Sequence, residues 1–138
     1  MGKADVVLID TSSWIEALRS GGDSDVRRRV HTLMLDGRAA WCDLVVVELW
    51  NGARGEYEKQ QLHNLEKEIT CLETTSGVWQ TARTLATESR KAGKTVPAAD
   101  LIIAACALSH GAAIEHCDSH IDFILNAHRP PKTSKGRG

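Results

Sequence analysis

The chain has 138 residues, the length of one ordinary globular domain. Hydrophobic residues make up 42% and charged residues 25% of it, as in a typical folded soluble protein. The formal net charge of −1 argues against a protein that coats nucleic acid with a strongly basic surface. Because the sequence shows neither an apolar stretch long enough to span a bilayer nor a secretion signal, we expect a cytoplasmic protein with no membrane partner.

Short apolar runs predict the strands. The first run, Val6 to Ile9, has no alternation of polar residues, which is typical of a strand covered on both faces of a parallel sheet. Ser13 and Glu16 then have the form of a capping box, so a helix is expected to begin there. Further strands are predicted at residues 38–43, 70–75 and 112–117.

Helical patterns fill the intervals between these runs. Apolar residues recur at helical spacing, and Gly37, Gly52 or Gly55, Gly93 and Gly111 are expected near the helix ends. Strands that alternate with helices predict a parallel sheet with right-handed crossovers, so the fold class is α/β. We expect one domain over residues 1–126 and a basic, disordered tail over residues 127–138, which is rich in Pro and Gly.

The four cysteines are scattered and form no CxxC pair: Cys42, Cys71, Cys106 and Cys117. We therefore expect them to be reduced and mostly buried. Cys117 could form a zinc site with His116 and His120, but these residues lack the paired spacing of structural zinc sites.

Two aspartates follow predicted strands. Asp10 comes directly after the first strand, and Asp118 directly after the last. Each could serve only as a turn or helix cap. However, Ser13 already offers a cap for the first helix, and ligands of open α/β sheets gather outside the carboxyl ends of strands. The two carboxylates are therefore candidates for a site at that edge.

Two further acids lie on predicted helices. Glu48 interrupts the apolar run LVVVELW; it either faces solvent or, if turned inward, needs a partner or a metal ion. Asp100 lies in the first turn after Pro97, where the helix dipole alone favours an anion by about 0.3–1 kcal/mol. If the four acids converge, they repel one another and a divalent cation is the natural balancing charge. Carboxylate ligands suit Mg²⁺ or Mn²⁺ and metal-assisted phosphoryl transfer.

Four stretches, in this order, resemble the motifs of PIN-domain ribonucleases, above all the VapC-type toxins of bacterial toxin–antitoxin pairs: LIDTSSWIEAL, VVVELWNGAR, KTVPAADLIIAACALSHGA and HCDSHIDFI. The similarity runs from about Val6 to Phe123. It implies a three-layer α/β/α sandwich with a short central parallel sheet. It also implies a homodimer that cleaves single-stranded RNA by metal-activated water, with Mg²⁺ as cofactor and Mn²⁺ as substitute. The partner that it implies is a small antitoxin, which inhibits the enzyme.

The resemblance assigns catalysis and metal binding to Asp10, Glu48, Asp100 and Asp118, with Thr11 and Ser12 ordering the first motif. The last motif departs from the family pattern. His116 stands where many relatives have a small hydroxyl residue, and Asp122 is a further candidate that shares or replaces the role of Asp118. The alternative functions are a catalytically inactive PIN-like module that binds RNA or a partner, and an aspartyl phosphatase. An aspartyl phosphatase needs a second aspartate two residues after the nucleophile, and this chain has Ser12 at that position.

Overall fold

A wholly parallel sheet of four short strands forms the centre of the fold in the computed structural model, which describes residues 5–129. Its strands, in the order β3-β2-β1-β4, are β1 (Val7–Ile9), β2 (Ala39–Cys42), β3 (Thr70–Leu72) and β4 (Ala113–Glu115). Leu8 of β1 pairs with Ala40 on one side and with Ile114 on the other. The four predicted strands and their parallel arrangement are therefore confirmed.

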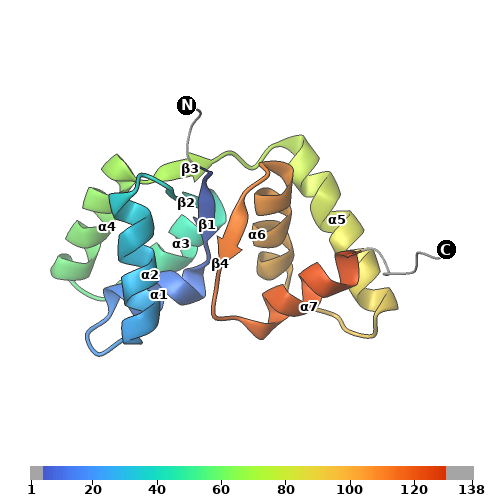
Figure 1. Ribbon diagram of the computed structural model, residues 1–138, viewed down its shortest axis with the longest axis horizontal. Coiled ribbons are helices and arrows are strands. Elements are labelled where there is room, and N and C mark those ends of the chain that lie inside the picture. The colour runs from blue at the N-terminus through green and yellow to red at the C-terminus, as the bar shows by residue number, and fades with distance from the viewer. Residues whose placement is uncertain (1–4, 130–138) are drawn as a thin grey trace.

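Seven helices connect and cover these strands within the described residues: α1 (Thr11–Leu18), α2 (Ser24–Leu35), α3 (Asp43–Gly52), α4 (Glu56–Glu68), α5 (Ser76–Lys91), α6 (Ala98–Ser109) and α7 (Ser119–His128). In Figure 1, α1, α2 and α4 lie to the left of β1 and β4, whereas α5, α6 and α7 lie to the right. The helices thus form layers on both sides of the sheet, which confirms the predicted α/β sandwich.

The core lies where the sheet meets these layers. Every residue of β1 is buried, as its uninterrupted apolar sequence predicts. Trp14 of α1 and Trp41 of β2 are almost completely buried, and their rings pack at a tilt with centroids 5.4 Å apart. This packing holds α1 against β2, the strand that neighbours β1 in the sheet.

Two local predictions differ from the structure. The N-cap of α1 is Asp10 and not Ser13, which lies inside the helix and is completely buried. Helix α7 continues to His128, so the first two residues of the expected tail are helical; residues 130–138 of that tail lie outside the described part of the chain. The four cysteines are free, but only Cys42 and Cys106 are buried.

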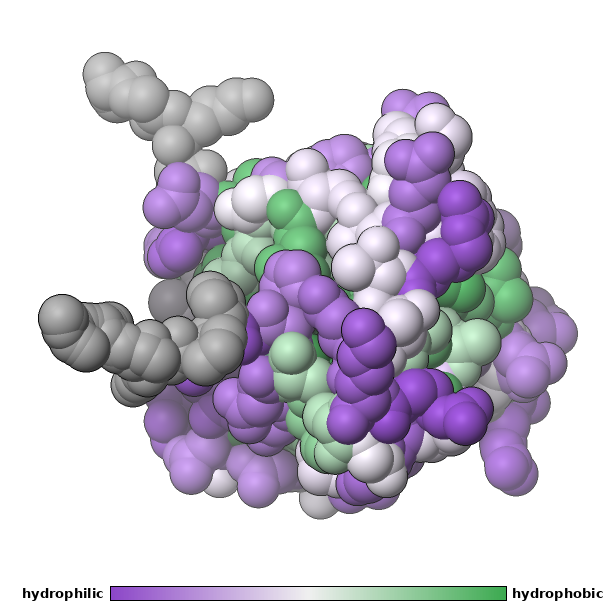
Figure 2. Space-filling model, turned by 90° about the vertical axis from the view of Figure 1, so that its right-hand side faces the viewer, coloured by the Kyte–Doolittle hydropathy of each residue, from purple (hydrophilic) through white to green (hydrophobic). Residues whose placement is uncertain are grey.

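The outer surface of the α5 and α7 layer is mainly hydrophilic, with scattered apolar side chains (Figure 2). Helix α5 explains this surface, because Val78, Ala82 and Leu85 turn its apolar stripe towards the core. Among the helices of residues 5–129, none is long and apolar enough to cross a membrane.

Candidate active site

Asp10 lies at the carboxyl end of β1, and its side chain is almost entirely buried, with 3% of the residue exposed. Its Oδ2 atom accepts hydrogen bonds from the backbone N–H of Ser12 at 3.1 Å and from the Ser12 hydroxyl at 2.6 Å. Asp10 is therefore a helix cap as well as a candidate ligand, because the same interactions that begin α1 also fix the carboxylate at the sheet edge.

Ser12 joins the first and the last motif. Its Oγ atom donates to Asp10 and also accepts a hydrogen bond from the backbone N–H of Cys117, at 3.0 Å. Cys117 directly precedes Asp118, so one hydroxyl connects the end of β1 to the segment that carries the last acid. This contact supports the ordering role that the resemblance assigned to Ser12.

Glu48 turns inward from α3. Its Oε1 atom accepts a short hydrogen bond from the hydroxyl of Thr11, the first residue of α1. The contact is partly buried and joins two elements that are 37 positions apart. Of the two alternatives considered for Glu48, a solvent-facing and an inward carboxylate, the structure has the inward one.

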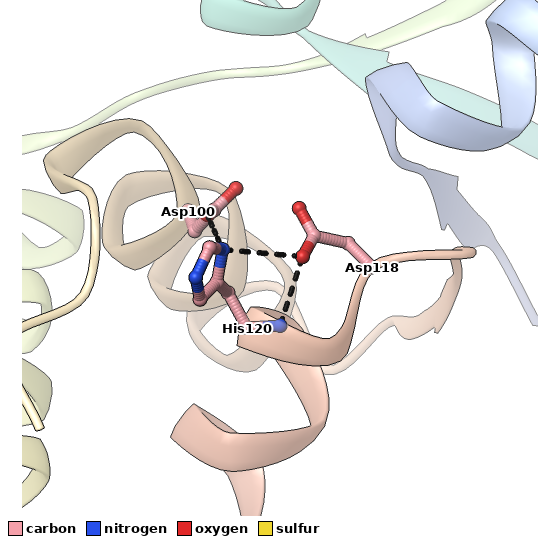
Figure 3. A group of neighbouring side chains, drawn as sticks. All are labelled: Asp100, Asp118 and His120. Atoms are coloured by element: carbon pink, nitrogen blue, oxygen red, sulfur yellow. Dashed lines mark hydrogen bonds and ion pairs between the residues drawn. The ribbon is translucent and has the colours of Figure 1, made fainter.

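Asp100, Asp118 and His120 form a cluster at the other side of the site (Figure 3). Asp100 lies in the first turn of α6, whereas Asp118 is the N-cap of α7 and accepts the His120 N–H at 2.8 Å. The Nδ1 atom of His120 lies 3.3 Å from Asp100 Oδ2 and 3.3 Å from Asp118 Oδ1. One ligand atom from each residue lies within 4.8 Å of the other two.

The charges of the other three predicted acids all act on Asp100. The pKa of Asp100 is raised from 3.8 to about 6, first because burial disfavours the charged carboxylate and then because of the negative charge of Asp118. Asp10 and Glu48 raise the pKa of Asp100 further, and only His120 acts in the opposite direction. Carboxylates from the end of β1, from α3 and from the start of α7 therefore each disfavour the ionised form of Asp100.

This donor set fits a divalent cation. Two atoms that bind one small cation at about 2.0–2.2 Å lie about 3.0–3.5 Å apart. The separations between His120 Nδ1 and the two carboxylates are within that range. The bound charge would also relieve the repulsion that raises the pKa of Asp100. Asp100, Asp118 and His120 are thus able to hold a metal ion, with Asp10 and Glu48 close enough to contribute charge.

The remaining side chains of the last motif point elsewhere. His116 Nε2 lies 3.2 Å from Asp122 Oδ1, and the Asp122 side chain is 69% exposed. Cys117 Sγ lies 3.4 Å from the hydroxyl of Ser13. The three residues considered for zinc therefore diverge, and His120 joins the two aspartates instead. Asp122 contacts His116 and is not in the cluster of Asp100, Asp118 and His120.

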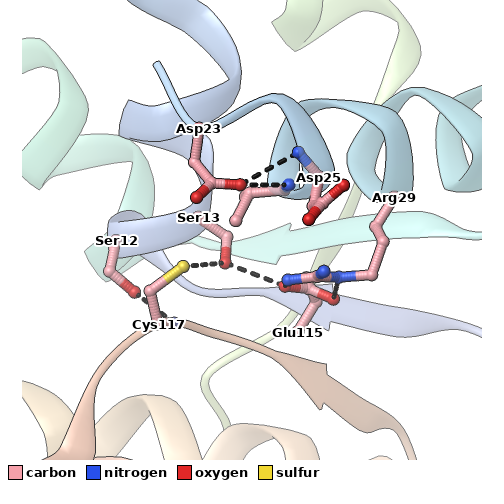
Figure 4. Close-up of polar contacts among 8 residues, drawn as sticks. Ser12, Ser13, Asp23, Asp25, Arg29, Glu115 and Cys117 are labelled. Carbon is pink, nitrogen blue, oxygen red and sulfur yellow. Dashed lines mark hydrogen bonds and ion pairs between the residues drawn. The ribbon is translucent and has the colours of Figure 1, made fainter.

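A polar brace made of Arg29, Glu115 and Ser13 was not predicted from the sequence (Figure 4). Arg29 of α2 forms two hydrogen bonds to the Glu115 carboxylate, at 2.9 and 3.0 Å. The Ser13 hydroxyl donates to the same carboxylate at 3.1 Å. The brace ties α1 and α2 to β4 just before Asp118. A carboxylate inside the short predicted strand AAIEHC was the signal that could have revealed it.

The fold and the site define an α/β protein with an acidic cluster, able to hold a cation, at the carboxyl edge of its parallel sheet. The family model described as "PIN domain" matches residues 7–124. The chain belongs to the PIN domain family, as its motifs suggested.

Relatives within the family are similar over nearly their whole length. The chain is 32% identical over 123 residues to "VapC ribonuclease Mb1587" of Mycobacterium bovis and to "Ribonuclease VapC11" of Mycobacterium tuberculosis. Each alignment covers 86% of this chain and 91% of the relative.

Two solved structures have the same fold at lower sequence identity. FitAcB from Neisseria gonorrhoeae superposes with a TM-score of 0.70 at 24% identity, over 88% of this chain and 94% of that chain. A toxin–antitoxin complex from Klebsiella pneumoniae gives a TM-score of 0.64 at 17% identity, over 78% and 82% of the two chains. At these identities the likeness establishes the fold.

Proposed function

We propose that this protein is a metal-dependent endoribonuclease that hydrolyses single-stranded RNA and acts as the toxin of a toxin–antitoxin pair. The observation that carries the proposal is the cluster of Asp100, Asp118 and His120 at one edge of the sheet, where the charges of Asp10, Glu48 and Asp118 all disfavour the ionised form of Asp100. Asp10 and Asp118 cap helices, but helix capping does not require several carboxylates to lie where their charges oppose one another, and a cation would balance these charges. The identity of 32% to VapC ribonucleases supports RNA as the substrate.

The chain's own residues have two tasks in this reaction. Asp100 and Asp118 would hold the cation, while the hydroxyl groups of Thr11 and Ser12 fix the carboxylates of Glu48 and Asp10 beside them. A bound Mg²⁺ or Mn²⁺ lowers the pKa of water and offsets charge that develops on the phosphodiester. The carboxylates alone would repel an RNA phosphate, so the protein is expected to bind RNA productively only when it is loaded with metal. The expected products carry a 5′-phosphate and a 3′-hydroxyl.

The proposed partners follow from the same charge pattern. An antitoxin segment that inserts an Arg or Lys among the carboxylates would occupy the place of both metal and substrate, through charge-assisted hydrogen bonds. The shared fold with a toxin–antitoxin complex supports a protein inhibitor of this kind. A homodimer of the toxin is the oligomer proposed for this chain.

The test is cleavage of a mixed single-stranded RNA pool by the purified protein. Mg²⁺ or Mn²⁺ should support cleavage, Ca²⁺ should bind without efficient turnover, and EDTA should stop the reaction. Asp10→Asn should lower the rate on the order of 100-fold, because it removes charge from the site but keeps a good helix cap. Asp25→Asn is the matched control, since Asp25 lies on α2 and pairs with Arg28 in solvent.

Two results would contradict the proposal in different ways. Cleavage that survives exhaustive chelation would refute the metal mechanism. Metal-dependent RNA binding without cleavage, with equal results for wild type and Asp10→Asn, would favour the alternative of an inactive PIN-like binding module.

A further inference from the structure

His120 is the one nitrogen donor in the group of Asp100, Asp118 and His120, the cluster of metal-ligating side chains found among residues 5–129. Its side chain is 40% exposed, so the imidazole is open to solvent on one side and faces the carboxylates with Nδ1 on the other. Figure 3 shows this ring directed from the first turn of α7 towards the space between Asp100 and Asp118. The first turn of α7 therefore fixes the direction of the imidazole.

The distances from His120 Nδ1 indicate that it forms no simple hydrogen-bonded pair with either carboxylate. It lies at the same distance, 3.3 Å, from an oxygen of Asp100 and an oxygen of Asp118. A charge-assisted hydrogen bond between nitrogen and a carboxylate is shorter, about 2.7–2.9 Å. By contrast, His128 further along α7 lies 2.8 Å from Glu88, as expected for a simple pair. The two histidines of the same helix thus make different kinds of contact.

We propose that His120 is a metal ligand through Nδ1, and that the mixed set of one imidazole and two carboxylates makes this site favour a divalent transition-metal ion such as Mn²⁺ over Mg²⁺. The proposal rests on the metal site of the proposed function and adds a ligand to it. The physical reason is ligand chemistry: Mg²⁺ is a hard cation that binds oxygen, whereas first-row transition-metal ions also accept imidazole.

The competing interpretation treats His120 as a counter-charge. In that case a protonated imidazole balances Asp100 and Asp118, and any metal ion must displace it. The two interpretations predict opposite signs when the ring is removed. Loss of a ligand weakens metal binding, whereas loss of a competing cation strengthens it.

The experiment uses the full chain, freed of metal and titrated with Mn²⁺. Pulsed electron paramagnetic resonance of bound Mn²⁺ should show coupling to a ¹⁴N nucleus in the wild type, and His120→Ala should abolish it. The Mn²⁺ affinity of His120→Ala should fall by at least the roughly 10-fold that loss of even an indirect metal contact produces. His120→Asp should bind Mn²⁺ without nitrogen coupling and shift the preference towards Mg²⁺ by roughly the same factor, measured by competition.

His128→Gln is the matched control, because His128 lies on the same helix beside a carboxylate but outside the site. It should keep the nitrogen coupling and the wild-type affinity. Unchanged coupling in His120→Ala, or an Mn²⁺ affinity that rises in that variant, would overturn the proposal while leaving the metal site intact. A wild-type protein that binds no Mn²⁺ at all would overturn the metal site of the proposed function and this ligand together.

Discussion

The candidate site has two halves that the protein supports in different ways. In the first half, Asp10 and Glu48 each accept a hydrogen bond from a hydroxyl at the start of α1. In the second half, Asp100 and Asp118 face His120 at longer distances, and the pKa of Asp100 is raised to about 6. The first half is organised by donors that the chain itself provides, and the second by charges that a cation would balance.

The two halves allow structural acids to be distinguished from functional ones. A carboxylate that receives good hydrogen bonds contributes to folding, so its loss lowers stability as well as activity. A carboxylate held among like charges opposes folding in the absence of metal. Substitution in the second half should therefore separate activity from stability, whereas substitution of the hydroxyl groups in the first half should affect both.

The largest expected effect is that of Asp100→Asn. RNA cleavage should fall on the order of 100-fold, because charge is lost from the metal site. The melting temperature of the metal-free protein should stay level or rise at neutral pH, since one repelling charge is removed. The gain in melting temperature on adding Mg²⁺ should shrink through lost binding linkage. A destabilised variant that cuts RNA at the wild-type rate would show that Asp100 serves only as a first-turn acid that stabilises α6 through the helix dipole.

The same variant has a pH signature. Between 3.8, the ordinary pKa of an aspartate, and about 6, the folded protein keeps a proton on Asp100 that the unfolded chain has released. The contribution of Asp100 to the stability of the metal-free protein therefore decreases as the pH rises through this window. The stability of Asp100→Asn relative to wild type should be greatest above about pH 6 and lowest below pH 3.8, in paired thermal melts.

The strands and the acids could be predicted because both depend on local patterns. An apolar run such as Val6 to Ile9 defines a buried strand, and the position of Asp10 after it follows from the sequence alone. The predicted cap of α1 was wrong because both Asp10 and Ser13 fit the local pattern of a helix start. Ser13 has the spacing of a capping box, but its hydroxyl is used by Glu115, a residue 102 positions away.

The place of His120 could not be predicted for a similar reason. In the sequence, His116, Cys117 and His120 are close together and suggest a common site. In the structure, the start of α7 turns them in different directions, so that the nearest neighbours in sequence have different partners. Which side chain meets Asp100 depends on the packing of α7 against α6, which no local pattern encodes.

A smaller effect is expected for Thr11→Val in the first half. Valine has nearly the shape of threonine but donates no hydrogen bond, so Glu48 loses the contact that orients it. Metal affinity and RNA cleavage should each fall roughly 10-fold, as for other residues that orient a ligand. Stability should fall by about 0.5–1.5 kcal/mol. Thr11→Ser is the control that keeps the hydroxyl. Equal cleavage rates for the two variants would show that the Thr11 hydroxyl does not orient Glu48 for catalysis.

The polar brace of Arg29, Glu115 and Ser13 lies outside both halves and should give the smallest effect. Arg29→Gln removes two hydrogen bonds to Glu115, whose side chain is 13% exposed, so stability should fall by about 1 kcal/mol. Arg28→Gln breaks only an exposed pair with Asp25 and should change stability by at most a few tenths of a kcal/mol. Chemical denaturation of both variants measures the difference, and RNA cleavage should stay close to wild type in each. A loss of cleavage in Arg29→Gln as large as that in Asp100→Asn would show that the brace positions Asp118, and the division into two halves would then have to include it.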